Sequence, residues 1–150
     1  MRPICVAVFA LVPLVSAGCG GSPTTPTATI FRQGTLTIGQ THIADLDTGT
    51  LVSNPLGTSD VWFEAVTNDE RYLTPTGARL AVSGMTAPGF AVCDATTLTA
   101  SRIPVATLRA GLYVCARTDE ARIVEIRVVE PPGPSGAAAA LTISFTTYNK

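Results

Sequence analysis

The chain contains a single histidine, His42, the side chain that most often acts as a general base near neutral pH. Any Ser-His-Asp or Cys-His mechanism would therefore have to use it. His42 lies between Thr41 and Ile43 in a predicted strand, and no Gly-x-Ser-x-Gly nucleophile motif occurs in the sequence. These observations favour a strand histidine, and a hydrolase that uses His42 is the less favoured alternative.

Acidic residues occur in two groups that could bind metal or transfer protons. The segment Asp45–Gly49 (DLDTG) places two carboxylates beside a glycine, as calcium loops do. An EF-hand is excluded, because Leu56 stands where the closing bidentate glutamate is expected. A calcium site completed by backbone carbonyls stays open, but an Asp-x-Gly turn is the simpler interpretation. We predict no metal, no cofactor and no catalytic group, and we interpret Glu64, Asp69 and Glu70 as a solvated strand end.

Two aromatic residues offer contacts for recognition. Trp62 and Phe63 are adjacent, so in a strand their side chains point to opposite faces of the sheet. One is expected to enter the core, and the other to be exposed or covered by a loop. An exposed ring could contact a sugar or a protein partner. The candidate ligand contacts are Trp62, Phe63 and His42.

The N-terminal segment ends in a cysteine with chemistry of its own. Arg2 supplies a positive charge, and Ile4–Val15 is apolar but too short to span a hydrocarbon core of about 30 Å. Ala17 and Gly18 precede Cys19. This segment resembles the signal peptide and lipobox of bacterial lipoproteins, whose cysteine is linked to diacylglycerol and becomes the mature N-terminus. The family most often has leucine where this chain has Ser16.

The resemblance implies a location and a domain organisation. Residues 1–18 would be a signal peptide, and Cys19 would carry the lipid, with acyl chains such as palmitate, that holds the protein on the membrane. Gly20 is not the aspartate that retains such proteins at the inner membrane, so the outer membrane is expected. Cleavage after Val15-Ser16-Ala17 would instead give a secreted or periplasmic protein. Residues 19–29 are rich in Gly, Ser, Pro and Thr and are predicted to form a tether, with one β domain at 30–150.

Composition limits the class of partner. Removing residues 1–18 takes away Arg2 and leaves nine basic and eleven acidic residues, a formal charge near −2. This balance gives no electrostatic reason to bind nucleic acid. The 132 residues that remain are enough for one domain with a real core.

Cysteine usage is typical of an exported protein. Cys5 would leave with the signal and Cys19 would take the lipid, which leaves Cys93 and Cys115. In an oxidising compartment these two are predicted to form a disulfide. Two free thiols are the main alternative, and a metal pair is disfavoured because neither cysteine has a neighbour at zinc spacing.

The periodicity of the chain indicates strands. Leu141, Ile143 and Phe145 alternate with threonines and a serine, and residues 112–129 resemble a hairpin closed by a short turn. Five more strands are predicted at 35–39, 42–46, 60–66, 78–83 and 89–93. The best helical candidate is a turn or two at 94–100. Seven or eight short strands predict an all-β fold, an antiparallel sandwich or flattened barrel.

The hairpin also resembles one family pattern. Residues 111–128 (GLYVCARTDEARIVEIRV) are similar to a hairpin of bacterial exported β-domains with the pattern Gly-x5-Arg-Thr-x2-Gly-Arg. Segments 45–50, 60–63 and 71–78 fit the same largely uncharacterised group. Ala121 stands where the pattern has glycine, which argues against a positive-φ turn there. The resemblance implies a fold and an exported location, but no activity. Related haem-binding lipoproteins use paired histidines, and this chain has His42 alone.

Together these features predict a lipid-anchored cell-envelope protein that is a non-catalytic binding or accessory module, with a protein or carbohydrate ligand. A structural component of an envelope assembly is the alternative.

Overall fold

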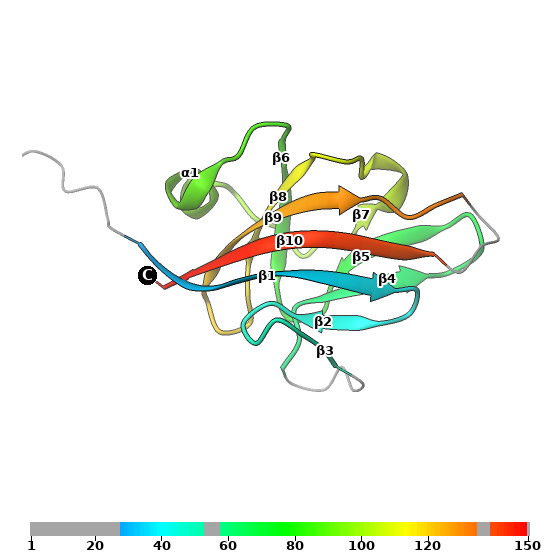
Figure 1. Cartoon of the computed structure of the whole chain (residues 1–150), viewed down its shortest axis with the longest axis horizontal. Helices are drawn as coiled ribbons and strands as arrows, with labels where there is room; N and C mark the ends of the chain where they lie inside the picture. The colour runs from blue at the N-terminus through cyan, green and yellow to red at the C-terminus, as the bar shows by residue number, and fades with distance from the viewer. Residues whose placement is uncertain (1–27, 53–57, 135–138, 150) are drawn as a thin grey trace, which may run out of the picture.

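The computed structural model describes residues 28–52, 58–134 and 139–149, which form two antiparallel five-stranded sheets (Figure 1). The first sheet has the order β1-β10-β9-β8-β6 and the second β3-β2-β4-β5-β7. The elements are β1 (Thr29–Gly39), β2 (Ile43–Asp45), β3 (Thr50–Val52), β4 (Val61–Ala65), β5 (Arg71–Pro75), β6 (Arg79–Gly84), α1 (Gly89–Ala95), β7 (Ile103–Pro104), a 3-10 turn (Val105–Thr107), β8 (Tyr113–Arg117), β9 (Ile123–Glu130) and β10 (Ala140–Asn149). The sheets are not closed into a barrel, so the predicted β-sandwich is confirmed.

The core lies between the two sheets and follows the alternation of the sequence. Leu141, Ile143 and Phe145 of β10 are buried, while the intervening polar residues point outward. Val124 and Ile126 of β9 are buried beside them. The buried face of β10 continues at Thr147, which is polar but fully buried. Its hydroxyl donates to the Leu46 carbonyl at 2.7 Å. This bond satisfies both polar groups and joins β10 to the second sheet.

Two predictions around residue 90 are wrong. Residues 89–93 are the start of helix α1 instead of a strand, and the helix ends at Ala95 before most of the predicted 94–100. A short apolar run does not separate a buried strand from a helix, and here Phe90 and Cys93 are buried on one helical face three residues apart. Thr96 follows with extended backbone, because β-branched residues favour that conformation.

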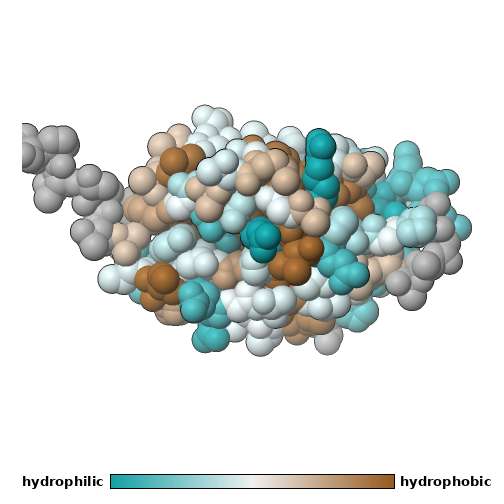
Figure 2. All heavy atoms as spheres, turned by 45° about the horizontal axis from the view of Figure 1, so that its top comes forward, coloured by the Kyte–Doolittle hydropathy of each residue, from teal (hydrophilic) through white to brown (hydrophobic). Residues whose placement is uncertain are grey.

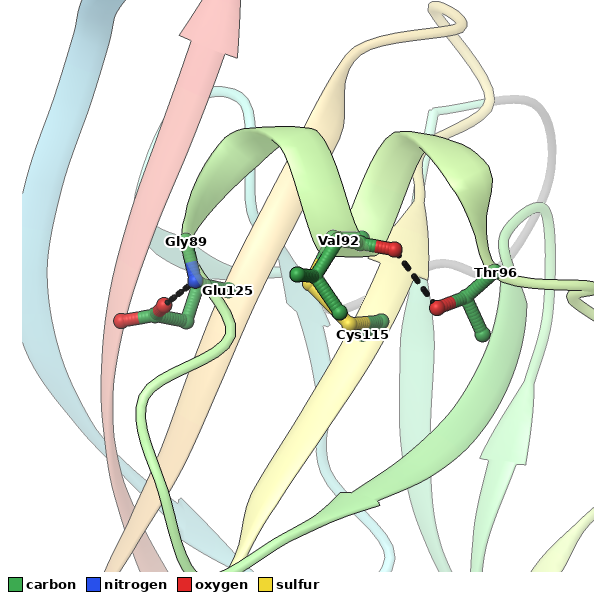
Figure 3. The surroundings of a disulfide bond; sticks show 6 residues. Gly89, Val92, Thr96, Cys115 and Glu125 are labelled. Atoms are coloured by element: carbon green, nitrogen blue, oxygen red, sulfur yellow. Dashed lines mark hydrogen bonds between the residues drawn. A yellow bond between two sulfur atoms is a disulfide. The ribbon is translucent and has the colours of Figure 1, made fainter.

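The predicted disulfide between Cys93 and Cys115 is present, and it lies outside the main core. Cys115 is on the outer face of β8, and α1 covers it there (Figure 3). Phe90 and Ile123 complete a second small apolar cluster with the two cysteines. At the start of the helix the Gly89 N–H donates to the carboxylate of Glu125 on β9 at 2.6 Å (Figure 3). The helix is therefore held to the sheet by one covalent and one polar contact.

The hairpin β8–β9 explains the motif of residues 111–122 in structural terms. Arg117 pairs with Asp94 of α1 at 3.5 Å, and Thr118 and Arg122 exchange hydrogen bonds across the turn. Arg122 pairs with Asp47 at 2.9 Å. Ala121 has φ 63°, so the turn keeps the positive φ that the alanine argued against. Hydrogen bonds on both sides of Ala121, from its own N–H to Thr118 and across the turn, hold it there.

The surface shows no broad apolar area on the face seen in Figure 2, where apolar residues lie in separate groups among polar ones. The exposed large apolar residues are Ile30, Phe31, Leu51, Val66, Val82, Met85, Val92 and Val129. None of the helices in the described ranges has the length and apolar character needed to cross a bilayer.

Candidate functional site

The two adjacent aromatic residues of β4 separate as expected for a strand. Phe63 is fully buried in the core, against Leu73 of β5. It presents no surface, so of the two rings only Trp62 is placed to contact a ligand. Trp62 lies on the outer face of the second sheet, partly exposed, between Ile43 of β2 and Thr74 of β5. Sequence reasoning could not choose between the rings, because both are large and apolar.

The indole N–H of Trp62 is buried and has no acceptor within the part of the chain that the structure describes. Leaving such a donor unpaired costs about 1–3 kcal/mol, and unpaired buried donors are rare in folded proteins. Tyrosine and tryptophan normally find a partner for their polar atom when buried.

A polar cluster continues the outer face beyond Trp62. Glu64 accepts a hydrogen bond from the Thr74 hydroxyl at 2.5 Å and pairs with Arg102 at 3.5 Å. The Arg102 guanidinium also lies 3.8 Å from the centre of the Tyr72 ring, a cation–π contact. Glu64 was predicted to be part of a solvated strand end, but it is the centre of this cluster. Its partners are Thr74 of β5 and Arg102, the residue before β7, which are distant in sequence, so no local pattern could have indicated them.

His42 lies on the same sheet, at the turn between β1 and β2. Its Nδ1 is 3.1 Å from the Gln40 carbonyl, and the residue is exposed. Thr41 beside it has φ 68°, a conformation that directs the chain into the turn. Within the described residues, the hydrogen bond of the His42 side chain is with a backbone carbonyl and not with a carboxylate. This is the arrangement of a surface histidine and not of a triad base.

A shallow hollow lies beside His42. It has a volume of about 300 Å³ and is lined by Thr41, His42, Ile43, Leu51 and Val52. Ile43, which lines the hollow, pairs with Trp62 across β2 and β4, but the indole is not among the lining residues. Of the three predicted contacts, His42 lines this hollow, while Trp62 lies on the outer face of β4 and Phe63 is in the core.

The opposite end of β2 carries a second arrangement, in which the Asp45–Gly49 segment of the sequence analysis is joined by Asp60, a residue given no role there. Asp45, Asp47 and Asp60, here called the aspartate cluster, are all buried, and one carboxylate oxygen of each lies within 4.8 Å of the others. Asp45 accepts hydrogen bonds from the N–H groups of Asp47 and Thr48 at 2.8 and 2.9 Å, which gives the predicted turn. Asp60 had no assigned role, because it is distant in sequence and reaches the turn through the pairing of β2 with β4.

Asp60 joins two turns. Its Oδ2 accepts from the Leu46 N–H at 2.7 Å and its Oδ1 from the Asp119 N–H at 3.0 Å. Burial raises the pKa of Asp60 to about 7 from an ordinary 3.8, against the lowering effect of these two hydrogen bonds. The neighbouring carboxylates of Asp47 and Asp119 raise it further.

No protein-family model, curated protein or solved structure matches this chain. Cys19, the predicted lipidation site, and the segments 1–18 and 20–27 lie outside the described residues. A proposal of function therefore rests on the geometry around Trp62 and around the aspartate cluster.

Proposed function

We propose that this chain is a lipid-anchored cell-envelope protein whose β-sandwich is a binding or accessory module, with Trp62 as its principal ligand contact. The observation that carries the proposal is a partly exposed indole on the outer face of β4, whose buried N–H has no acceptor among the described residues. An aromatic ring next to polar groups with fixed positions is typical of sites that bind sugars or protein segments.

Two further features support binding at the envelope. The Cys93–Cys115 disulfide is the kind of bond that persists outside the cytoplasm. The lipobox-like segment ending at Cys19 would place the domain at a membrane, with the outer membrane favoured by Gly20. The polar cluster of Glu64, Tyr72 and Arg102 gives the binding face donors and acceptors beside the indole.

Trp62 is the only tryptophan of the chain, so its fluorescence reports on this face alone. We expect the fluorescence emission of the full-length protein to change on titration with cell-wall oligosaccharides or with envelope proteins. The titrant that changes the emission identifies the class of ligand. Trp62→Ala should weaken binding, measured by co-sedimentation, by about fivefold or more, because aromatic anchors commonly contribute over about 1 kcal/mol.

The matched control is Tyr113→Ala, an aromatic residue on the outer face of the opposite sheet. This variant should bind as the wild type does. Equal loss in both variants, or no loss in Trp62→Ala, would contradict the proposal. An assembly defect without ligand binding would instead favour a structural role, and an activity lost only in His42→Ala would favour a hydrolase.

A further inference from the structure

The aspartate cluster has the dimensions of a cation site. Its three carboxylate oxygens lie within 4.8 Å of one another and come from β2, the β2–β3 turn and the residue before β4. Calcium binds oxygen at about 2.3–2.6 Å, so two ligands on opposite sides of the ion are about 5 Å apart. One ion can therefore contact all three carboxylates without a rearrangement of the strands.

One oxygen of the cluster points to a ligand independently of this spacing. Asp47 is 3 % exposed, its Oδ1 accepts from Arg122 at 2.9 Å, and its buried Oδ2 accepts from no donor among residues 28–52, 58–134 and 139–149. An ionised carboxylate oxygen buried without a donor is costly, because it has lost its water and gained no partner. The equivalent oxygens of Asp60 both have donors, from the N–H groups of Leu46 and Asp119. The lone pairs of Asp47 Oδ2 are therefore available to a cation, and the carboxylate belongs to the aspartate cluster.

The charges around the cluster also favour a cation. Arg122 is the guanidinium paired with these carboxylates, and it is shared with Glu120. Arg32 donates to the backbone carbonyl of Asp47 at 3.0 Å, whereas Arg122 contacts the Asp47 carboxylate. Asp119 adds another carboxylate at the exposed edge. Asp45, Asp47 and Asp60 have one guanidinium between them among the described residues, and a divalent ion bound to the three carboxyl groups would supply positive charge that favours their ionised forms.

We propose that Asp45, Asp47 and Asp60 bind one Ca²⁺ ion at this end of the second sheet. An all-oxygen carboxylate set suits a hard cation, and Ca²⁺ accepts the irregular directions of a turn better than Mg²⁺, which requires near-octahedral geometry. The exposed carboxylate of Asp119 lies at the edge from which the ion and its remaining water ligands enter. The ion would lock the β2–β3 turn to the β8–β9 turn, which Asp60 already connects. This proposal is independent of the Trp62 face.

The test is calcium binding by the full-length protein in detergent, after treatment with EGTA and its removal. Isothermal titration with CaCl2 should show one ion bound per chain. The melting temperature should rise by about 5 °C or more at saturating Ca²⁺, because the ion binds the folded state and not the unfolded chain. MgCl2 should give a smaller shift. No heat and no shift with Ca²⁺, or an equal response to Mg²⁺, would overturn the proposal.

Asp47→Asn is the decisive variant, because asparagine keeps an acceptor for Arg122 and removes the charge of the unpaired oxygen. It should raise the Ca²⁺ dissociation constant by more than about tenfold. Asp69→Asn, the same change at an exposed residue outside the cluster, is the control and should bind as the wild type does. Circular dichroism in EGTA checks that both variants are folded. Unchanged affinity in folded Asp47→Asn would contradict the assignment of the site.

Discussion

Individual residues in this protein hold conformations that their side chains do not favour. Thr41 and Ala121 both have positive φ, at 68° and 63°. For an L-residue this conformation costs roughly 1–2 kcal/mol, which glycine avoids. Ala121 is exposed, so its methyl group contributes no burial that would offset the cost. The strain is local, and a single substitution can relieve it.

Ala121→Gly is expected to stabilise the protein by about 1 kcal/mol, measured as the change in the free energy of unfolding by denaturant titration. The control is Ala91→Gly on the exposed side of α1, where the same change should destabilise by about 1 kcal/mol because the backbone is helical. Destabilisation by both substitutions would show that Ala121 is not strained in solution.

Elements meet closely where the β5–β6 turn passes the hairpin β8–β9. Gly77 lies against the Ser59 carbonyl and the Asp119 side chain, and a Cβ built there would approach them to 2.6 and 2.8 Å. Ser59 precedes Asp60 in the chain, and the Asp119 N–H donates to the Asp60 carboxylate. The β5–β6 turn, the start of β4 and the hairpin are therefore packed together. There is no room at this point for even a methyl group.

Gly77→Ala should therefore destabilise the protein by about 2 kcal/mol, within the range of overpacking, because one of the contacts is with backbone. Gly133→Ala is the matched control, since a Cβ there meets nothing within 4 Å. Its unfolding free energy should change by less than about 0.5 kcal/mol. Chemical denaturation of both variants makes the comparison, and equal effects would contradict the close approach at Gly77.

Helix α1 is attached to its sheet by the disulfide and by Glu125. Replacing Cys93 and Cys115 together by alanine should lower the free energy of unfolding by about 3 kcal/mol, as expected for a loop of 22 residues on the chain-entropy model. Comparison with the reduced wild type checks that the loss belongs to the bond and not to the side chains. A loss below about 1 kcal/mol would indicate that the small apolar cluster alone holds the helix.

The stability of the whole molecule should depend on pH through Asp60. Its pKa is about 7 in the folded state and 3.8 ordinarily, so the folded state binds this proton more tightly. Stability from this group is fully present below pH 4 and is lost as the pH rises toward 7. The other charged groups facing it are Asp45, Asp47, Asp119, Glu120 and Arg122.

In EGTA, unfolding free energies measured between pH 4 and 8 should fall less steeply in Asp60→Asn than in the wild type, because asparagine does not titrate. The variant should also be less stable overall, since its amide nitrogen faces a backbone N–H donor. Parallel pH profiles for the two proteins would contradict the raised pKa.

Cellular location is also a property of the whole molecule. Cys19→Ser should move the protein from the membrane fraction to the soluble fraction, because serine cannot form the thioether to the lipid. Immunoblotting of fractionated cells is the measurement. A variant that stays in the membrane fraction, or a soluble wild type, would contradict the lipid anchor.

The sequence alone was enough for the class of fold and for several of its parts. The period of two in β9 and β10 identified their buried faces, and the hairpin was visible because its strands are neighbours along the chain. The disulfide was predicted because an export signal and a lipidation site at Cys19 would leave two cysteines, Cys93 and Cys115. These are local or compositional signals. The strands β3, β5 and β7 were missed, since their few residues lie at or near sheet edges and show little alternation.

Only the tertiary structure decided which residues meet. Periodicity says that Trp62 and Phe63 face opposite ways, but the pairing of the sheets determines that Phe63 is inside. Asp60 joins Asp45 and Asp47 because β4 pairs with β2, and Arg122 reaches Asp47 across 75 residues of chain. Such contacts depend on how distant strands are ordered, and a single sequence carries no local signal for that order. The proposed binding face and the proposed calcium site both depend on this order.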